Sequence, residues 1–166
     1  MKALFLLRHA KSSWGNPAQE DRDRPLNDRG KLNAPLMGGR FATRNEVLDL
    51  IITSPATRAR CTAELFAEAC GLPANSIVEE PNLYFTSTRS IEDLIIRQNN
   101  DIQSLMLVFH NPDITYFSNS IDTASPIVNV PTCGLIKLNC DIENWCDWSV
   151  SKTRFGYFDY PKKITA

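Results

Sequence analysis

Residues 3–9 read ALFLLRH and residues 105–112 read LMLVFHNP, and these two stretches decide the fold. Each begins with an apolar run of five residues, which is typical of a strand in a parallel sheet that is covered on both faces. Each run leads to a histidine, His9 or His110, and the chain contains no other histidine. Because ligands bind beyond the carboxyl ends of the strands in such sheets, the two imidazole rings are predicted to meet at one site.

The remaining sequence alternates between strand-like and helix-like segments, which predicts one α/β domain over residues 1–166. Strands are predicted over residues 2–8, 48–53, 76–79, 105–109, 134–140 and 148–158. Helices are predicted over residues 28–44, 55–70, 90–98 and 112–121. No helix separates the last two strands, so we expect them to pair antiparallel in a sheet that is otherwise parallel.

Two of the predicted helices have clear start signals. Asn27 is a suitable N-cap for the first, whose inner face is predicted to carry Leu32, Leu36, Met37 and Phe41. The second is expected to begin with Ser54 as its N-cap and Pro55 at the first helical position.

Composition excludes several classes of protein. The net charge of −1 provides no basic field for nucleic acid or for an anionic membrane, and no apolar run approaches the ~20 residues of a membrane span. The N-terminal apolar run is too short for a signal peptide, so a cytoplasmic location is expected. The five cysteines include no Cys-x-x-Cys pair, which argues against a disulfide framework or a zinc knuckle.

Cationic side chains follow three of the predicted strands. Arg8 and His9 follow the first, Arg58 lies one turn into the helix after the second, and His110 follows the fourth. Helical side chains lean toward the N-terminus, so Arg58 is expected to project over the same edge of the sheet. Two guanidinium groups, two imidazoles and a helix N-terminus together form a pocket for a dianion, for which phosphate is the natural candidate.

Such a pocket suits phosphoryl transfer through a covalent phosphohistidine. One neutral imidazole attacks phosphorus in line, and the arginines stabilise the nonbridging oxygens as charge develops. The second imidazole, held protonated by the bound phosphate, is a further donor to those oxygens.

The segments that carry these residues resemble the three signature segments of the histidine phosphatase superfamily: LLRHA at 6–10, SPATRA at 54–59 and HNP at 110–112. Further segments resemble the SixA-type phosphohistidine phosphatase branch of that superfamily: RHAKSSW at 8–14, RPLN at 24–27 and LY at 83–84. The resemblance runs nearly from end to end, in the order and at the spacing of the family.

The resemblance implies a three-layer α/β/α sandwich around a mainly parallel sheet. It implies that His9 is the nucleophile and that Arg8, Arg58 and His110 complete the phosphate pocket. It also implies a reaction without metal or cofactor, in which phosphate passes to His9 and water hydrolyses the intermediate. The expected partner is a phosphorylated protein, such as a histidine-containing phosphotransfer domain or a phosphocarrier, or a small phosphorylated molecule.

The sequence departs from the family pattern at three positions. Ala10 replaces the usual glycine after the nucleophile, and Phe109 replaces the glycine before the second histidine, where its ring would crowd the rim or fill one face of the strand. Asp113 replaces a common glycine, and it is a candidate proton donor or a helix cap. Glu79 and Glu80 end the third strand, but neither these residues nor Asp113 lies in a motif that matches the general acid of larger relatives. The site is therefore expected to prefer N–P bonds or activated aryl phosphates over sugar phosphates.

Other side chains have weaker claims on the substrate. Arg24, Lys11, Ser12 and Asn111 are candidates for substrate binding, although the loop around Arg24 also suits a plain solvated segment. Trp14 and Tyr84 are expected to pack rather than to recognise a ligand. A small-molecule phosphomonoesterase and a non-catalytic protein that binds phosphorylated ligands remain the alternative functions.

Overall fold

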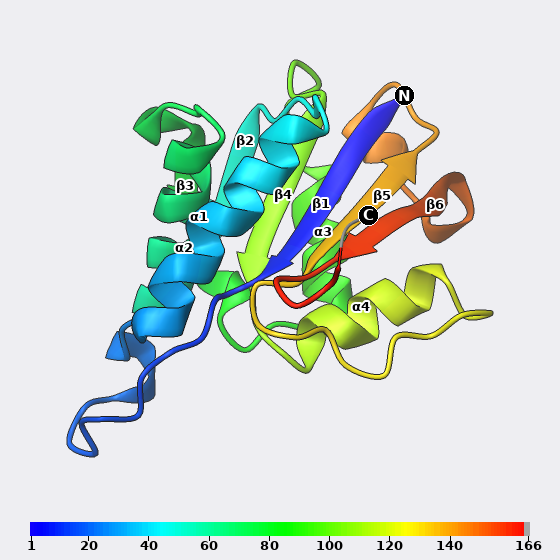
Figure 1. Cartoon of the computed structure of the whole chain (residues 1–166). Coiled ribbons are helices and arrows are strands. Elements are labelled where there is room, and N and C mark those ends of the chain that lie inside the picture. Colours follow the sequence, from blue (N-terminus) through cyan, green and yellow to red (C-terminus); the bar gives the residue numbers. More distant parts are fainter. Residues whose placement is uncertain (165–166) are drawn as a thin grey trace.

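The computed structural model describes residues 1–164 and contains one mixed sheet with helices on both faces (Figure 1). The strands are β1 (Lys2–Arg8), β2 (Leu50–Thr53), β3 (Ile77–Glu79), β4 (Ser104–Phe109), β5 (Leu135–Cys140) and β6 (Thr153–Asp159). Their order across the sheet is β3-β2-β4-β1-β5-β6. The first four strands are mutually parallel, and β5 and β6 run antiparallel as predicted.

Four α-helices cover the sheet: α1 (Asp28–Thr43), α2 (Thr57–Ala69), α3 (Thr88–Ile96) and α4 (Asp113–Ile121). Short 3-10 turns lie at Asp21–Asp23, Ala74–Ser76, Pro81–Leu83, Trp145–Asp147 and Val150–Lys152. Figure 1 shows α1 and α2 together in front of the sheet, and α3 behind it. None of the helices within residues 1–164 has both the length and the apolar character needed to cross a bilayer.

The alternation of side chains along β1 explains why the sheet is covered twice. Leu4 and Leu6 belong to the apolar core shared with α3 and α4, whereas Phe5 and Leu7 belong to the core shared with α1 and α2. All four side chains are fully buried. Successive residues of a strand point to opposite faces, so an uninterrupted apolar run requires a layer of helices on each side. The fold is therefore an α/β sandwich of three layers, in agreement with the sequence.

Phe109, which replaces a small residue of the family pattern, is accommodated by this alternation. Its ring is fully buried in the core shared with α3 and α4, next to Ile114 and Phe117. It fills one face of the strand and does not crowd the rim.

The chain changes face between two neighbouring strands, β1 and β4. The helix that follows β1 packs on one face of the sheet, and the helix that follows β4 packs on the other. The two strands are parallel and in register, with Arg8 opposite Phe109. Connections that leave neighbouring strands in opposite directions open a crevice at the carboxyl edge of the sheet, and His9 and His110 enter it at the same level.

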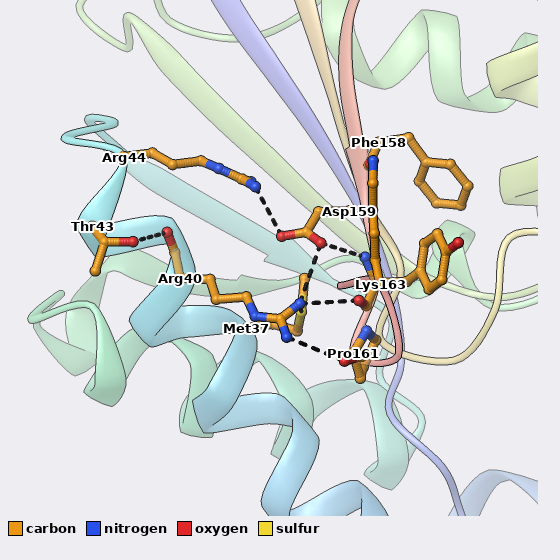
Figure 2. Close-up of polar contacts among 9 residues, drawn as sticks. Met37, Arg40, Thr43, Arg44, Phe158, Asp159, Pro161 and Lys163 are labelled. Atoms are coloured by element: carbon orange, nitrogen blue, oxygen red, sulfur yellow. Dashed lines mark hydrogen bonds and ion pairs between the residues drawn. The ribbon is translucent and has the colours of Figure 1, made fainter. Parts of the chain in front are cut away.

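A buried carboxylate attaches the end of β6 to α1 (Figure 2). Asp159 is fully buried, and its oxygens accept hydrogen bonds from Arg40 at 3.3 Å and from Arg44 at 3.0 Å. Arg40 also donates to the carbonyl oxygens of Tyr160 and Pro161. Since a buried charge needs a partner, this pair of arginines allows the antiparallel edge to close against the helical layer.

The predicted start of α2 is wrong. The helix begins at Thr57 with Ala56 at the N-cap position, and Ser54 does not cap it. The Ser54 hydroxyl instead accepts a hydrogen bond from the Ala56 N–H and contacts the His110 ring. The residue that looks like a cap is part of the site.

Two further predictions need correction. The inner face of α1 does not include Leu32 and Leu36, which are 72% and 44% exposed; Ala34, Met37, Gly38 and Phe41 are buried there instead. The last strand starts at Thr153 rather than at Trp148, because two 3-10 turns precede it.

Gly38 lies at a close approach of α1 to α2, and its neighbour Gly39 provides a matched control. A Cβ atom at Gly38 would lie 2.5 Å from the Phe66 carbonyl oxygen, whereas one at Gly39 would have no neighbour within 4 Å. We expect Gly38→Ala to destabilise the protein by about 1–3 kcal/mol through overpacking and Gly39→Ala to stabilise it by about 0.5–1 kcal/mol. Urea unfolding measures both changes, and equal effects would contradict the packing described here.

Candidate active site

The two histidines lie next to each other beyond the carboxyl ends of β1 and β4. Their ring centroids are 5.1 Å apart, and the ring planes are tilted by 50°. Each residue is only 7% exposed. His110 also lines a cavity of about 240 Å³, together with Arg58, Tyr84 and Asp113. The structure thus brings residues from four distant segments to one edge of the sheet.

Backbone hydrogen bonds hold these segments together after the strands end. The His9 N–H donates to the Phe109 carbonyl at 3.1 Å, and the Ser54 N–H donates to the Val108 carbonyl at 2.9 Å. Thr62 connects the segment after β1 to α2, because its hydroxyl accepts from the Ala10 N–H and donates to the Arg58 carbonyl. The site is therefore built on the ends of strands and on the first turns of a helix.

A single contact fixes the tautomer of His9. Its Nδ1 atom lies 2.7 Å from the Ala10 carbonyl oxygen. A carbonyl can only accept, so neutral His9 carries its proton on Nδ1 and donates it there. The lone pair of the ring is therefore on Nε2, which is the nucleophilic position.

Ser54 contacts the opposite ring nitrogen of His110. The His110 Nε2 atom lies 2.7 Å from the Ser54 hydroxyl. That hydroxyl accepts from the Ala56 N–H and has no other acceptor for its own proton among residues 1–164, so we assign this proton to the hydrogen bond with Nε2. Neutral His110 then carries its proton on Nδ1, and this atom is buried without a hydrogen-bond partner among residues 1–164.

Both arginines are held in the same way. Arg8 donates from Nη1 to the Val130 carbonyl at 2.8 Å, and Arg58 donates from Nη1 to the Asp21 carbonyl at 2.6 Å. In each, Nε is buried and finds no partner within the described part of the chain. A guanidinium group binds an oxyanion well through the edge formed by Nε–H and the neighbouring Nη2–H. The contacts on Nη1 leave that edge available in both residues.

Five buried side-chain nitrogen or oxygen atoms lack a partner among residues 1–164. Three of them belong to the predicted phosphate pocket, namely Arg8 Nε, Arg58 Nε and His110 Nδ1, and the other two are Trp148 Nε1 and the Tyr157 hydroxyl. A buried donor without a partner costs about 1–3 kcal/mol. Such groups are rare in native structures and call for an explanation, of which an absent ligand is one. A tetrahedral oxyanion next to His9 matches the number and the charge of the three pocket donors.

Burial keeps both imidazoles neutral. It lowers the pKa of His9 well below its usual value, and the neighbouring His110 and the arginines act in the same direction. Burial and then the charge of Arg58 lower the pKa of His110 to about 3. A neutral imidazole is the form that can attack phosphorus, so His9 is available as a nucleophile at neutral pH.

Asp113 is the one carboxylate among the described residues that line the cavity. Burial raises the pKa of Asp113, against the effect of a hydrogen bond from the Thr86 backbone. Glu79 contacts Arg60, and Glu80 accepts from the Asn82 N–H; neither lines the cavity. Phe85 also lines it and is 84% exposed.

Of the remaining candidates for substrate binding, Ser12, Arg24 and Asn111 form hydrogen bonds with other residues of the protein. Arg24 donates to the Ser12 hydroxyl at 2.8 Å, and its guanidinium group lies 3.6 Å from the centre of the Trp14 ring. Asn111 donates to the Val130 carbonyl, which is the acceptor that holds Arg8. Lys11 is half-buried and does not line the cavity. Ser12 and Arg24 thus hold each other and do not line the cavity, whereas Asn111 lines it.

Sequence reasoning missed one central residue, Asp21. Its carboxylate accepts from Arg58 at 3.0 Å, from Arg24 at 3.0 Å and from the Tyr84 hydroxyl at 2.6 Å. Tyr84 also packs against His110 at the cavity, with the two ring centroids 5.5 Å apart. Asp21 looked like one of several solvated charges in a polar loop, and only its spacing of three residues from Arg24 could have suggested a contact.

Comparison with known proteins assigns this fold and site to a class. The profile of the histidine phosphatase superfamily (branch 1) matches residues 4–84. A crystal structure of the provisionally assigned phosphohistidine phosphatase SixA from Agrobacterium tumefaciens is 31% identical, with a TM-score of 0.81 over 96% of this chain and 98% of that one. The chain belongs to the histidine phosphatase superfamily.

Other relatives define the extent of the likeness. A structure of the protein histidine phosphatase SixA complexed with tungstate shares the fold at 20% identity, with a TM-score of 0.79 over 95% of this chain and 96% of that chain. A chloroplast protein of Arabidopsis thaliana, described as uncharacterized, is 26% identical over 87% of this chain and 69% of its own length. The phosphoglycerate mutase GpmB of Photorhabdus laumondii, itself a provisional assignment, is 36% identical over 50% of this chain but only 37% of its own length.

Neutral, buried histidines predict how stability depends on pH. In the unfolded chain each imidazole titrates near 6.5, whereas in the folded protein both pKa values are lower. The unfolded state therefore binds more protons below about pH 6.5, and the free energy of unfolding must fall as the pH falls below that value.

Ring NMR titration together with urea unfolding at about pH 7 and pH 5 measures this effect. Orthophosphate is expected to raise both pKa values, because its negative charge favours the imidazolium. A ring that titrates near 6.5 in the free protein would contradict the burial described here.

Proposed function

We propose that this protein is a metal-independent phosphatase that forms a covalent intermediate on His9 and acts on phosphohistidine of signalling or phosphocarrier proteins. The observation that carries the proposal is the set of three unpartnered donors around a nucleophile of fixed tautomer. Membership of the superfamily supports the phosphatase reaction. The likeness to SixA structures supports the choice of phosphohistidine.

The first step transfers the phosphoryl group to the enzyme. The lone pair on His9 Nε2 forms a bond to phosphorus while the bond from phosphorus to the substrate nitrogen breaks. Arg8, Arg58 and His110 donate to the three nonbridging oxygens, where charge develops. The His9 proton remains on Nδ1 and stays hydrogen-bonded to the Ala10 carbonyl, which stabilises the positive charge that the ring acquires.

The second step returns the enzyme to its starting state. Water attacks phosphorus, the His9–P bond breaks, and orthophosphate leaves with the two protons of the water distributed between it and the solvent.

The leaving group of the first step needs no help from the protein. The imidazole of the substrate departs neutral, because it carries a proton on its other nitrogen. A nitrogen leaving group of this kind does not require an acid from the protein.

The mouth of the site favours a protein as the substrate. Phe85 presents an aromatic ring that is 84% exposed beside the cavity, where it would contact the surface around a phosphorylated side chain. Aromatic side chains of this kind are enriched at protein interfaces.

All five cysteines of the described chain are free thiols, which supports a reducing compartment such as the cytoplasm.

A small-molecule phosphomonoesterase is the second candidate function, and Asp113 is the observation that favours it. An alkoxide leaves poorly unless it is protonated. Asp113 lines the cavity, and burial raises its pKa, so it is the candidate donor for such a leaving group.

The proposal is tested with purified wild type and His9→Ala on para-nitrophenyl phosphate and on a phosphohistidine protein, with and without EDTA. We expect the wild type to turn over each substrate at the same rate with and without EDTA. We expect His9→Ala to lose activity by at least about 10³-fold, because the variant lacks the imidazole that is proposed to accept the phosphoryl group. Binding of phosphate without turnover, or loss of activity in EDTA, would contradict the proposal.

Asp113→Asn decides between the two substrate classes. We expect it to leave the hydrolysis of phosphohistidine within about threefold of wild type, and to lower the hydrolysis of alkyl phosphates by about 10²-fold if any is present. A panel of phosphohistidine protein, glycerol phosphate and a sugar phosphate measures both. Sugar phosphates that are hydrolysed faster than phosphohistidine by the wild type would favour the phosphomonoesterase.

A further inference from the structure

A four-residue cluster lies beside the cavity, at the 3-10 turn Asp21–Asp23, and two of its members line the cavity. Its centre is the Asp21 carboxylate, and its other members are Arg58, Arg24 and Tyr84. One oxygen, Oδ1, accepts from Arg24, and the other, Oδ2, accepts from both Arg58 and Tyr84. The carbonyl oxygen of the same residue accepts from Arg58 Nη1.

Asp21 contacts only one edge of the Arg58 guanidinium group. The two hydrogen bonds come from Nη1 and Nη2, which together form the end of the group. The side edge, formed by Nε–H and the second Nη2–H, remains free, and Nε is buried without a partner among residues 1–164. A planar group that is fixed along one edge cannot rotate, so these contacts set the direction in which the free edge points.

The protonation state of the cluster makes this contact permanent near neutral pH. Burial opposes ionisation of Asp21, but the hydrogen bond from Tyr84 and the charge of Arg58 outweigh it and lower its pKa to about 2. The carboxylate is therefore an acceptor for all three donors throughout the range in which a phosphatase works.

We propose that Asp21 is a positioning residue that fixes Arg58 edge-on to the transferring phosphoryl group and secures Tyr84 and Arg24 around it. The proposal rests on the proposed function, since it assigns a role within that reaction. Asp21 itself does not touch the substrate. It acts through the guanidinium, whose donors must meet oxygens as they move in the transition state, and a small misplacement of such a group has a large effect on rate.

Removal of the Asp21 carboxylate has two opposing effects on activity, so the direction of the change in activity is informative. Loss of the carboxylate removes a negative charge near a dianion site, which by itself would strengthen binding of phosphate and raise activity. Loss of the positioning contact releases the guanidinium and lowers the rate of the chemical step. If Asp21 merely occupied Arg58 in competition with the substrate, its removal would make the enzyme faster; if it positions Arg58, removal makes it slower.

The experiment compares Asp21→Asn with Asp23→Asn in steady-state hydrolysis of para-nitrophenyl phosphate. Asp23 lies in the same 3-10 turn and is exposed, so its variant removes the same charge without touching Arg58. We expect Asp21→Asn to lower kcat by about 10–100-fold without a proportional rise in KM, and Asp23→Asn to retain wild-type values. Tyr84→Phe, which keeps both arginine contacts of Asp21, is expected to lose less than Asp21→Asn.

Each outcome decides the proposal. A thermal melt of Asp21→Asn that matches wild type, together with the loss in kcat, supports positioning. Activity equal to or above that of wild type would overturn it, whatever the melt shows. If Asp21→Asn melts early, Asp21→Glu serves as the second variant, because it keeps the charge and displaces the contact, and wild-type kcat in that variant would also overturn the proposal. An inactive wild type would instead contradict the proposed function.

Discussion

A protein rarely buries a polar N–H without a partner, because each such group costs about 1–3 kcal/mol. This structure does so three times around one pair of histidines, at Arg8 Nε, Arg58 Nε and His110 Nδ1. Two devices make the arrangement stable. The strand pairing of β1 with β4 brings the segments together in register, and contacts on the far side of each group prevent it from turning away to find another partner. The pocket is thus organised before any ligand arrives, which is the condition under which electrostatic stabilisation of a transition state is most effective.

The electrostatics of the pocket follow from the same organisation. Two permanent cations lie next to two imidazoles that burial keeps neutral, so the proposed nucleophile, His9, does not have to lose a proton before it reacts. Asp21 contacts the Nη1 and Nη2 atoms of Arg58 and does not itself line the cavity. Asp113 adds a carboxylate at the mouth of the cavity, and it is the feature of this chain most relevant to the choice of leaving group.

Much of this could be predicted from the sequence, for identifiable reasons. The positions of His9 and His110 followed from two apolar runs, because a doubly covered parallel sheet allows few other interpretations. The wrong or missing predictions concern residues whose structural partners are distant in the sequence. Ser54 looks like a helix cap, but its hydroxyl contacts His110, which is 56 residues away. Leu32 has the spacing of an inner face, yet α1 approaches α2 through Gly38, where only a small residue fits. Asp21 was overlooked because its partners Arg58 and Tyr84 lie 37 and 63 residues away, and a charge in a polar loop is usually solvated.

In the proposed reaction, the three unpartnered donors and the Nε2 atom of His9 converge on one tetrahedral anion. A crystal structure of the wild-type protein with tungstate or vanadate would reveal whether they do. We expect the metal atom of the anion within bonding distance of His9 Nε2, and its oxygens at about 2.7–3.1 Å from Arg8 Nε, Arg58 Nε and His110 Nδ1. An anion bound elsewhere on the protein, with these donors still without partners, would contradict this expectation.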